Sequence, residues 1–584
     1  MKRLEAKSRT VSRSSPFQAL AESVRSGGVR ESERKIPRVP CSVWSTNIRI
    51  MDEVPYSFEG YEYLVEPVDL ITEKFIVRKG AQLGWTEAIG INRVLYGIVV
   101  RRASALYLLP TGDDVSDFSA ARMNPAIEDS PLLSQLFTQI NNVGLKRAGS
   151  ISLYLRGTNS RTKLKSIPVG ELYLDEYDEM DPANVTLAKE RLSGHKVKYE
   201  VNFSTPTIPE YGIDKEWRNS DQRMYVVECP FCKRKQYLDW PGNVVWDESD
   251  SSTASFCCQD CKHLWTYDDR AIAIKLGKWV VTNPNGSYPG YWINQLCSRT
   301  LTAVEIVRKF ITSEENDIKK KEWFNSVLGM PYVPKGGLLS LVEIRNVTTG
   351  PCMLNASAGC TMGVDVGAYY YYEIARWNGG RQKEVVRVGR VKNTEELYPL
   401  MHNYAIWRCV MDANPERREA RRFADHFRGR VFLAFYPTAK EELKKKVAEW
   451  DEANNIVSIA RTESLDITLG RFRRQGEIIL PRDIPDEYVQ HLRNVVRTLE
   501  EEERDGQPTG RVFSKYLETG PDHYVHASNY NDVAGNNQMS GYTLLKGVSA
   551  KEHVNQGSGS LFSVDRHEER PTDFSDIESR WGPA

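Results

Sequence analysis

Short apolar runs that end in polar clusters recur along the first half of the chain. The run Phe75-Ile76-Val77 leads into a loop at 79–86, after which a helical pattern begins near Glu87. Similar runs lie at 105–109, 171–174 and 199–203, and they end in Pro110-Thr111, Asp175-Glu176 and Ser204-Thr205-Pro206-Thr207. Strands that alternate with helical segments predict a parallel α/β sheet with its site at the strand carboxyl ends.

A second strand-rich region begins at Gly359. Residues 361–367 predict a strand that carries Asp365, with 370–377 as its hairpin partner. Residues 409–412 predict another buried strand that ends in Asp412, and an Arg-rich helix follows it. We therefore expect a second α/β domain.

Polar segments divide the chain. Residues 1–45 are rich in Ser and Arg, so we expect a flexible arm with one short amphipathic helix at 17–24. Gly-rich stretches around 336 and 350 indicate a linker, which we place at 341–355. The predicted domains are 46–340, with an insertion at 225–265, and 356–548; the polar stretch 549–584 is expected to be a mobile tail.

The composition is globular, with 40% hydrophobic and 27% charged residues. Lys+Arg and Asp+Glu are both 78, so any basic surface for nucleic acid must be local. No apolar run reaches the roughly 18–20 residues that span a bilayer, and the basic N-terminus lacks the apolar segment of a secretory signal. We therefore expect no membrane association.

The loop at 79–86 is a candidate phosphate loop. The usual pattern is Gly-x-x-x-x-Gly-Lys-Ser/Thr, in which backbone N–H groups hold phosphate and the hydroxyl holds Mg²⁺. Gly84 and Thr86 fit the last Gly and the hydroxyl, whereas Lys79 replaces the first Gly and Trp85 replaces the Lys. The cation must then come from Lys79 or Arg78. The predicted nucleotide-binding residues are Gly80, Ala81, Gln82, Leu83, Gly84, Trp85 and Thr86.

Two acids end the run at 171–174. Asp175 can hold Mg²⁺, and Glu176 can polarise the attacking water, as phosphoryl transfer to water requires. A Gly-containing turn and a strand ending in two acids are each common without such a role. The ordered combination of loop, acids and the cluster at 204–207 is less common, and it predicts ATP hydrolysis.

The cysteines form a second candidate site. Ten are present, and five lie between 229 and 261, which indicates metal binding in a reducing compartment. Cys229, Cys232, Cys258 and Cys261 form a CxxC…CxxC set that can complete a tetrahedral, structural Zn²⁺ site. Cys257 is a spare that can replace Cys258.

Acids of the second half are a third candidate site. Asp365 and Asp412 end neighbouring strands, and Asp522, His523 and His526 open a late helix. Together they can hold two Mg²⁺ or Mn²⁺ ions that activate water against a phosphodiester. Arginines that can line a phosphate-backbone path are Arg417, Arg418, Arg421, Arg422, Arg471, Arg473 and Arg474, although charged helix faces are usually only solvated.

These motifs, in this order, resemble the large terminase subunit of tailed double-stranded DNA phages, in the branch of the lambda-type large subunit. Residues 75–87 are similar to that branch's deviant phosphate loop, Asp175-Glu176 to its acidic strand, and 204–207, with Thr205, to the coupling motif that senses γ-phosphate. The stretches 461–466, 479–481 and 520–527 resemble its nuclease half.

The resemblance implies a P-loop ATPase domain with an inserted zinc ribbon, joined to an RNase H-like nuclease domain. Such a protein drives double-stranded DNA into an empty procapsid and cuts the concatemer. Asp365 and Asp412 match the family's first two metal-binding acids, and Asp522 with His526 falls near the third. The implied partners are a small terminase subunit, a portal ring and further copies in a ring, in the host cytoplasm and transiently on the procapsid.

Two other readings remain open from sequence. A helicase-like ATPase with a nuclease would separate strands rather than move intact duplex. A zinc-containing scaffold with a degenerate nucleotide loop, suggested by Trp85, would not turn over ATP.

Overall fold

The computed structural model describes residues 39–535 except 139, 166, 196–197, 379–380, 438–446 and 505–506. The described chain divides into two compact units, with the boundary between Tyr332 and Val333. We call them unit 1 and unit 2. The helix predicted at 17–24 and the tail predicted at 549–584 lie outside the described residues.

Unit 1 is built on an 11-stranded sheet in the order β11-β10-β16-β3-β9-β8-β4-β7-β6-β5, with β15 beside β10. The strands from β16 to β7 run parallel, which confirms the predicted parallel sheet. The four apolar runs of the sequence are β3 (Lys74–Lys79), β4 (Ala105–Leu109), β8 (Glu171–Asp175) and β9 (Tyr199–Ser204). Because they are parallel, their carboxyl ends lie at one edge. The other strands are β5 (Ile140–Asn142), β6 (Leu145–Ala148), β7 (Ile151–Gly157), β10 (Arg223–Glu228), β11 (Lys235–Tyr237), β15 (Lys278–Val281) and β16 (Gly290–Ile293).

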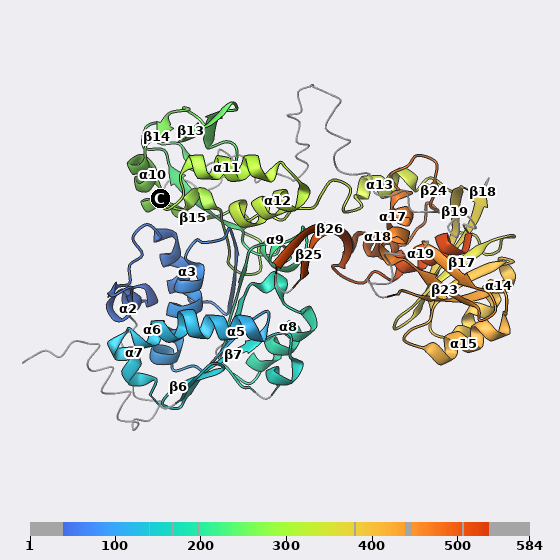
Figure 1. The fold of residues 1–584 in the computed structure, drawn as a ribbon, viewed down its shortest axis with the longest axis horizontal. Coiled ribbons are helices and arrows are strands. Elements are labelled where there is room, and N and C mark those ends of the chain that lie inside the picture. The colour runs from blue at the N-terminus through green and yellow to red at the C-terminus, as the bar shows by residue number, and fades with distance from the viewer. Residues whose placement is uncertain are drawn as a thin grey trace, which may run out of the picture. The chain divides into compact units, whose positions relative to one another are not determined.

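Helices follow these strands. The loop after β3 enters a continuous helical stretch of η2 (Thr86–Arg93), α4 (Val94–Tyr96) and η3 (Gly97–Arg101). Helix α5 (Gly112–Phe118) is capped by the Thr111 side chain and packs against β4 and β7 (Figure 1). The other helices are α3 (Val65–Asp69), η4 (Ser119–Met123), α6 (Asn124–Glu128), α7 (Pro131–Leu136), α8 (Pro182–Lys189), α9 (Gly212–Arg218), α11 (Ala303–Ser313), α12 (Asp317–Glu322) and η9 (Trp323–Leu328).

The predicted start of the globular part at residue 46 is wrong. Residues 41–45 belong to helix α2 (Cys41–Ile48), which follows Pro40. Cys41, Trp44 and Ile48 recur on one face of this helix and are buried in the core of unit 1. The burial of that face holds the segment in the domain rather than in the arm.

The cysteines lie in a small subdomain between β10 and α10 (Tyr267–Lys275), which we call the cysteine module (residues 229–265). Its antiparallel sheet consists of β12 (Val244–Asp247), β13 (Asp250–Cys257) and β14 (Leu264–Trp265). Helix α11 packs against β13. The two CxxC pairs lie in the turns after β10 and after β13.

Unit 2 contains an 8-stranded sheet in the order β22-β23-β21-β20-β17-β18-β19-β24. Strands β17, β20, β21 and β23 run parallel, and β18 is antiparallel to both neighbours. The strands are β17 (Thr361–Val366), β18 (Tyr370–Asn378), β19 (Gln382–Val391), β20 (Arg408–Asp412), β21 (Val431–Phe435), β22 (Ala448–Asp451), β23 (Ile456–Ile459) and β24 (Ile478–Ile479). The sheet confirms the mixed α/β class for this half.

Helix α19 (His523–Gly535) lies across β17, β18 and β20 (Figure 1). Gly363 permits this close approach, because a Cβ there would lie 2.0 Å from the Ala527 carbonyl oxygen. Other elements of unit 2 are α14 (Leu397–Asn403), α15 (Arg417–His426), α17 (Arg461–Gly470), α18 (Asp486–Arg493) and the hairpin of β25 (Val495–Arg504) and β26 (Gln507–Glu518).

The stretch predicted as a linker, 341–355, is not a bare connection. It begins with helix α13 (Leu341–Val347), which carries a capping box from Ser340 to Glu343. Ile344 and Val347 of this helix are buried in the core of unit 2. The capping residue and the apolar face make this segment part of the second unit.

Candidate functional site

The loop after β3 follows a fixed path into the helix. Gln82 and Gly84 have positive φ values of 57° and 76°, and they turn the chain. The Gly80 N–H donates to the Ile293 carbonyl at 2.9 Å, and the Ala81 N–H donates to the Ser326 carbonyl at 2.7 Å. The Gly80 and Ala81 amides are therefore already bonded to carbonyl groups, and the amides nearer the helix N-terminus are the ones that a phosphate could use.

Trp85 is a core residue. Its side chain is 1% exposed, and its ring centroid lies 6.4 Å from those of Trp279 and Tyr291. Leu83 is also 1% exposed. Leu83 and Trp85 were predicted to bind nucleotide, but with both side chains in the core only their backbones face the loop. Trp85 therefore has no role as a substitute for the usual lysine.

The two candidate cations have different surroundings. The Lys79 Nζ lies 3.0 Å from the Glu176 carboxylate, across the edge where β3 and β8 end. Arg78 points to the other face, where it donates to Asp214 at 2.5 Å and stacks 3.7 Å above the Trp217 ring. Arg78 is thus held in a buried ion pair, and Lys79 is the candidate cation that contacts Glu176.

Glu176 sits in a strained backbone position. Its φ of 56° is in the left-handed region, which a non-glycine residue seldom adopts. The side chain accepts hydrogen bonds from the Ser204 hydroxyl at 3.3 Å and from the Thr205 amide at 3.4 Å. The predicted acid, the predicted cation and the segment after β9 therefore meet at one point.

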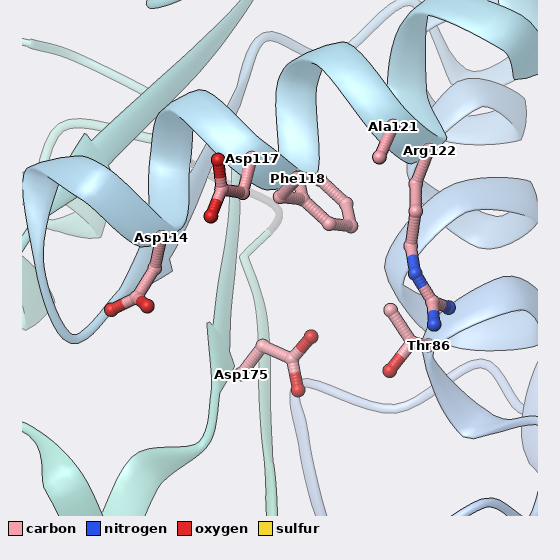
Figure 2. Close-up of a pocket in the computed structure, with 7 residues that line it drawn as sticks. All are labelled: Thr86, Asp114, Asp117, Phe118, Ala121, Arg122 and Asp175. Atoms are coloured by element: carbon pink, nitrogen blue, oxygen red, sulfur yellow. The ribbon is translucent and has the colours of Figure 1, made fainter. Parts of the chain in front are cut away.

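Asp175 and Thr86 line the same pocket, together with Asp114, Asp117, Phe118, Ala121 and Arg122. Figure 2 shows Thr86 and Arg122 on one side of this pocket and Asp175 facing them below helix α5. The Asp175 Oδ2 accepts from the Tyr107 hydroxyl at 2.6 Å, and its Oδ1 has no hydrogen-bond partner among the described residues. Burial and the neighbouring Glu176 raise the pKa of Asp175 to about 7. A buried carboxylate oxygen without a partner, opposite a hydroxyl, suits a hard cation.

Asp178 was not singled out from the sequence. Its Oδ2 accepts from the amide and the hydroxyl of Thr207 at 2.8 and 2.9 Å, and its Oδ1 accepts from the Ile213 amide at 2.5 Å. It thus ties the turn after Glu176 to the segment after β9 and to helix α9. The sequence feature that could have identified Asp178 is its position two residues after Glu176, in a run of acidic residues.

The four predicted metal-ligating cysteines converge. The sulfur atoms of Cys229, Cys232, Cys258 and Cys261 all lie within 4.8 Å of one another. Two pairs are separated by 3.9 Å (Cys229 and Cys261) and 3.7 Å (Cys232 and Cys258). A tetrahedral site with Zn–S bonds of about 2.3 Å has its sulfurs roughly 3.8 Å apart, so the set fits zinc. Cys257 lies outside it, against the Gly242 carbonyl.

Asp522 and His526 lie close together at the start of helix α19, whereas Asp365 and Asp412 do not belong to the group of ligand atoms that lie within 4.8 Å of one another in the described part of unit 2. His523 Nδ1 lies 2.8 Å from Asp365, and His526 Nε2 lies 3.2 Å from Asp522. Burial and the Asp365 carboxylate raise the pKa of Asp412 to about 6.

Glu518 extends this cluster and was missed in the sequence. Ligand atoms of Glu518, Asp522 and His526 lie within 4.8 Å of one another. Tyr436 is a second missed residue, because its hydroxyl lies 2.9 Å from His526 Nδ1. Neither residue is part of a recognisable sequence motif, and only the fold brings the two residues close to helix α19.

The predicted arginine path is only partly exposed. The prediction that Arg471 contacts phosphate is wrong, because the residue is 5% exposed and its side chain pairs with Asp532 at 2.9 Å. Arg473 and Arg474 are exposed but bonded to Glu343 and Glu477. Arg417, Arg418 and Arg422 are exposed on helix α15, and Arg421 on the same helix is partly buried and donates to the Asn454 carbonyl.

The loop, the acidic strand end and the segment bonded to it define unit 1 as an α/β domain of the nucleoside-triphosphatase class. Comparison with known families is more specific: residues 49–279 match the family described as phage terminase large subunit gpA, ATPase domain. This match confirms the resemblance to phage terminase large subunits. No helix among the described residues is long and apolar enough to cross a membrane.

Curated relatives agree with this family. The terminase large subunit of Escherichia phage lambda is 24% identical over 361 residues, which cover 54% of this chain and 55% of the relative. That of Enterobacteria phage P21 is 23% identical over 240 residues, covering 38% of this chain and 36% of the relative. The chain thus spans about half or less of these relatives.

Among solved structures, the HK97 bacteriophage large terminase matches at 10% identity and a TM-score of 0.49, covering 85% of this chain and 99% of that one. The large terminase nuclease of thermophilic phage G20c matches at 13% identity and a TM-score of 0.21, covering 31% of this chain and 84% of that one.

Proposed function

We propose that this chain is the motor and nuclease of a phage DNA-packaging machine. It uses ATP hydrolysis to move double-stranded DNA into a procapsid, and it cuts the concatemer. The observation that carries the proposal is the 3.0 Å contact of Lys79 with Glu176, inside the region that matches the terminase ATPase family.

ATP binds with its phosphates on the loop amides between Gln82 and Thr86. Lys79 is the predicted cation, and Arg122 is a second one, which lines the pocket with Thr86 and Asp175. Phosphate at Lys79 would compete with Glu176 for its ammonium group. Glu176 is then released from its ion pair and is free to accept a proton from the attacking water. Thr86 and Asp175 would hold Mg²⁺, which neutralises phosphate charge when bound.

The segment after β9 reports the state of the phosphate. The Ser204 hydroxyl and the Thr205 amide donate to Glu176 in this structure. When Glu176 turns to water, the Thr205 amide loses its acceptor, whereas the Ser204 hydroxyl keeps the Thr205 carbonyl at 2.8 Å, so the change at Glu176 reaches the segment through the Thr205 amide. Asp178 holds the next residues through Thr207, so the change is carried into helix α9.

Unit 2 is the nuclease in this proposal, with an RNase H-like arrangement of strands and acids. Asp365, Asp412, Asp522 and His526 would hold one or two Mg²⁺ or Mn²⁺ ions, which activate water and stabilise the leaving oxygen when bound. Glu518 joins this ligand set. His523, bonded to Asp365, orients that carboxylate.

The cysteine module is a zinc ribbon in this proposal. Four sulfurs at tetrahedral spacing leave no open position, so Zn²⁺ would stabilise the fold rather than act in catalysis. The Cys258 sulfur accepts two hydrogen bonds, from the Gln236 side-chain amide at 3.3 Å and from the Asp260 backbone amide at 3.4 Å. These donors favour the thiolate form that zinc needs.

We further propose that unit 1, which begins with helix α2 and ends at Tyr332, is the ATPase domain, and that unit 2, which includes helix α13, is the nuclease domain. The partners are double-stranded DNA, a small terminase subunit, the portal ring and further copies of the chain. The place of action is the host cytoplasm, with transient docking on the procapsid.

The test is ATP turnover with and without duplex DNA, in the wild type and in Glu176→Gln. We expect DNA-stimulated turnover that falls by about a hundredfold or more in the variant. Asp365→Ala is the matched control, since it should abolish cutting and leave turnover intact. A wild type that neither binds nor hydrolyses ATP would refute the motor.

A further inference from the structure

We propose that the tip of the cysteine module binds a DNA strand, with phosphates on its cations and one unpaired base on an exposed ring pair. The tip consists of the two metal-ligating turns, residues 229–235 and 258–264. This inference rests on the proposed DNA-handling function, but it assigns a contact that the motor and nuclease sites do not require.

The ring pair is Phe231 and His263. One comes from each turn, and their ring centroids lie 3.6 Å apart. Phe231 is 45% exposed, although a side chain of this size is usually buried in a domain with so much apolar core. Leu264, beside His263, is 54% exposed. An exposed ring held in place by a second ring is the kind of platform on which a nucleobase stacks.

Cations flank this platform on both turns. Lys233, Arg234 and Lys235 follow Phe231, Lys262 precedes His263, and all four side chains are exposed. Two exposed acids, Glu228 and Asp260, offset part of this charge. Apart from the cysteines, the exposed side chains of the tip are therefore net positive on a chain whose total charge is zero, which is the kind of local basic surface that binds a polyanion.

The cysteine geometry gives the tip a fixed shape. The sulfur atoms of Cys229 and Cys261, one from each turn, lie 3.9 Å apart, and those of Cys232 and Cys258, also one from each turn, lie 3.7 Å apart. A Zn²⁺ ion on these sulfurs would hold the two turns at a constant separation and would arrange the ring pair and cations before a ligand arrives. Preorganised groups lose little conformational freedom on binding.

A competing explanation is that the lysines only offset the negative charge of four thiolates around a zinc ion. Lys233 argues against it, because its side chain is 68% exposed and its nearest acid, Glu228, is 3.9 Å away. A strongly hydrated ammonium in that position contributes little to a site inside the module. An acidic protein partner is the other candidate occupant, but it would give no use to the exposed ring pair as a stacking platform.

The first experiment is photo-crosslinking in the full-length protein. A photo-crosslinking amino acid replaces Phe231, and in the matched control it replaces Leu276, which is 67% exposed and follows the end of α10. We expect crosslinks to a single-stranded oligonucleotide from position 231 and few from position 276. Wild-type binding of DNA without a crosslink at 231 would overturn this inference alone. Failure of the wild type to bind any DNA would overturn the proposed function with it.

The second experiment separates charge from stacking. Lys233→Gln with Lys262→Gln should reduce the salt dependence of single-strand affinity by a slope of about 1.4, because each lost phosphate contact removes about 0.7. Phe231→Leu should weaken single-strand binding about fivefold or more and leave duplex binding nearly unchanged. Lys275→Gln, at the end of α10, is the charge control. Zinc content is measured in each variant. Loss of zinc in the lysine variant, or equal effects on single strands and duplex in Phe231→Leu, would refute the assignment.

Discussion

Replacement of Lys383 by Met should destabilise unit 2 and loosen helix α19. The Lys383 Nζ lies 2.6 Å from Glu373 and 2.8 Å from Asp532, and all three side chains are fully buried. Asp532 belongs to α19, as does Ser528, whose carbonyl and hydroxyl accept from Lys383 at 2.9 and 3.0 Å. Lys383 therefore fixes the position of the helix whose first turns carry His523 and His526.

The magnitude follows from charge balance. The buried network holds two carboxylates, Glu373 and Asp532, and two cations, Lys383 and Arg471. Lys383→Met leaves one negative charge without compensation, and the removal of one partner from a buried pair costs about 3–5 kcal/mol. For a unit of this size that loss lowers the midpoint of thermal unfolding by about 6–20 °C. Lys383→Met with Glu373→Gln restores the balance and should recover about 1–3 kcal/mol.

The assay is calorimetric unfolding of the full-length protein, with the transition of unit 1 identified by its response to ATP. In parallel, DNA cutting is measured against Mg²⁺ concentration. We expect Lys383→Met to require more Mg²⁺ and to leave ATP turnover unchanged, because unit 1 is untouched. If the double variant is no more stable than the single one, charge balance is not the cause and the loss is one of packing. Unchanged Mg²⁺ dependence in a destabilised variant would show that the network does not position α19 for the metal site.

Three further outcomes test the remaining sites. Lys79→Met should lower ATP turnover by about a hundredfold or more, whereas Arg78→Lys should mainly lower stability. If unfolding and turnover assays show the reverse, Arg78 is the cation that acts on phosphate and Lys79 is the structural one. Mg²⁺-ATP affinity should rise with pH over roughly pH 6–8, because the raised pKa of Asp175, about 7, keeps that acid partly protonated at lower pH. Glu176→Gln should shift this profile to lower pH, because it removes the negative charge that raises the pKa of Asp175. An identical profile would show that Glu176 does not affect the titration of Asp175. Zinc chelation or Cys232→Ser should lower the unfolding temperature in proportion to zinc lost, while equal stability with and without zinc would exclude a structural ion.

Strand β4 could be predicted because its sequence is entirely apolar, and β3 and β9 because each contains a short apolar run among polar residues. The run at 105–109 has no polar residue, and it is the whole of strand β4. The ends of the domains were harder to predict from the sequence. Helix α2 carries only three core residues in a polar stretch, and helix α13 lies between Gly-rich turns, so composition over a window hid both. Their burial depends on partners that are distant in sequence.

The candidate sites divide in the same way. The four cysteines and the pair Asp175 and Glu176 are adjacent or regularly spaced, so local pattern sufficed. The choice between Lys79 and Arg78 could not be made from sequence, because neighbouring strand residues point to opposite faces and the sequence does not say which face holds the site. Arg471 was mistaken for a surface residue because its acidic partner, Asp532, is far away in the chain.

The exchange of lysine for Trp85 has a structural reason. Trp85 packs among Trp279 and Tyr291, so this position supports the core beneath the loop. The positive charge is supplied from the end of β3, where Lys79 lies in the sheet and is only 5% exposed. A lysine held by a strand has less freedom than one in the loop, and its ammonium is already directed at the strand that carries Glu176. In the proposed mechanism, the residue that would bind phosphate also restrains Glu176 when phosphate is absent, which would couple nucleotide binding to the release of this acid.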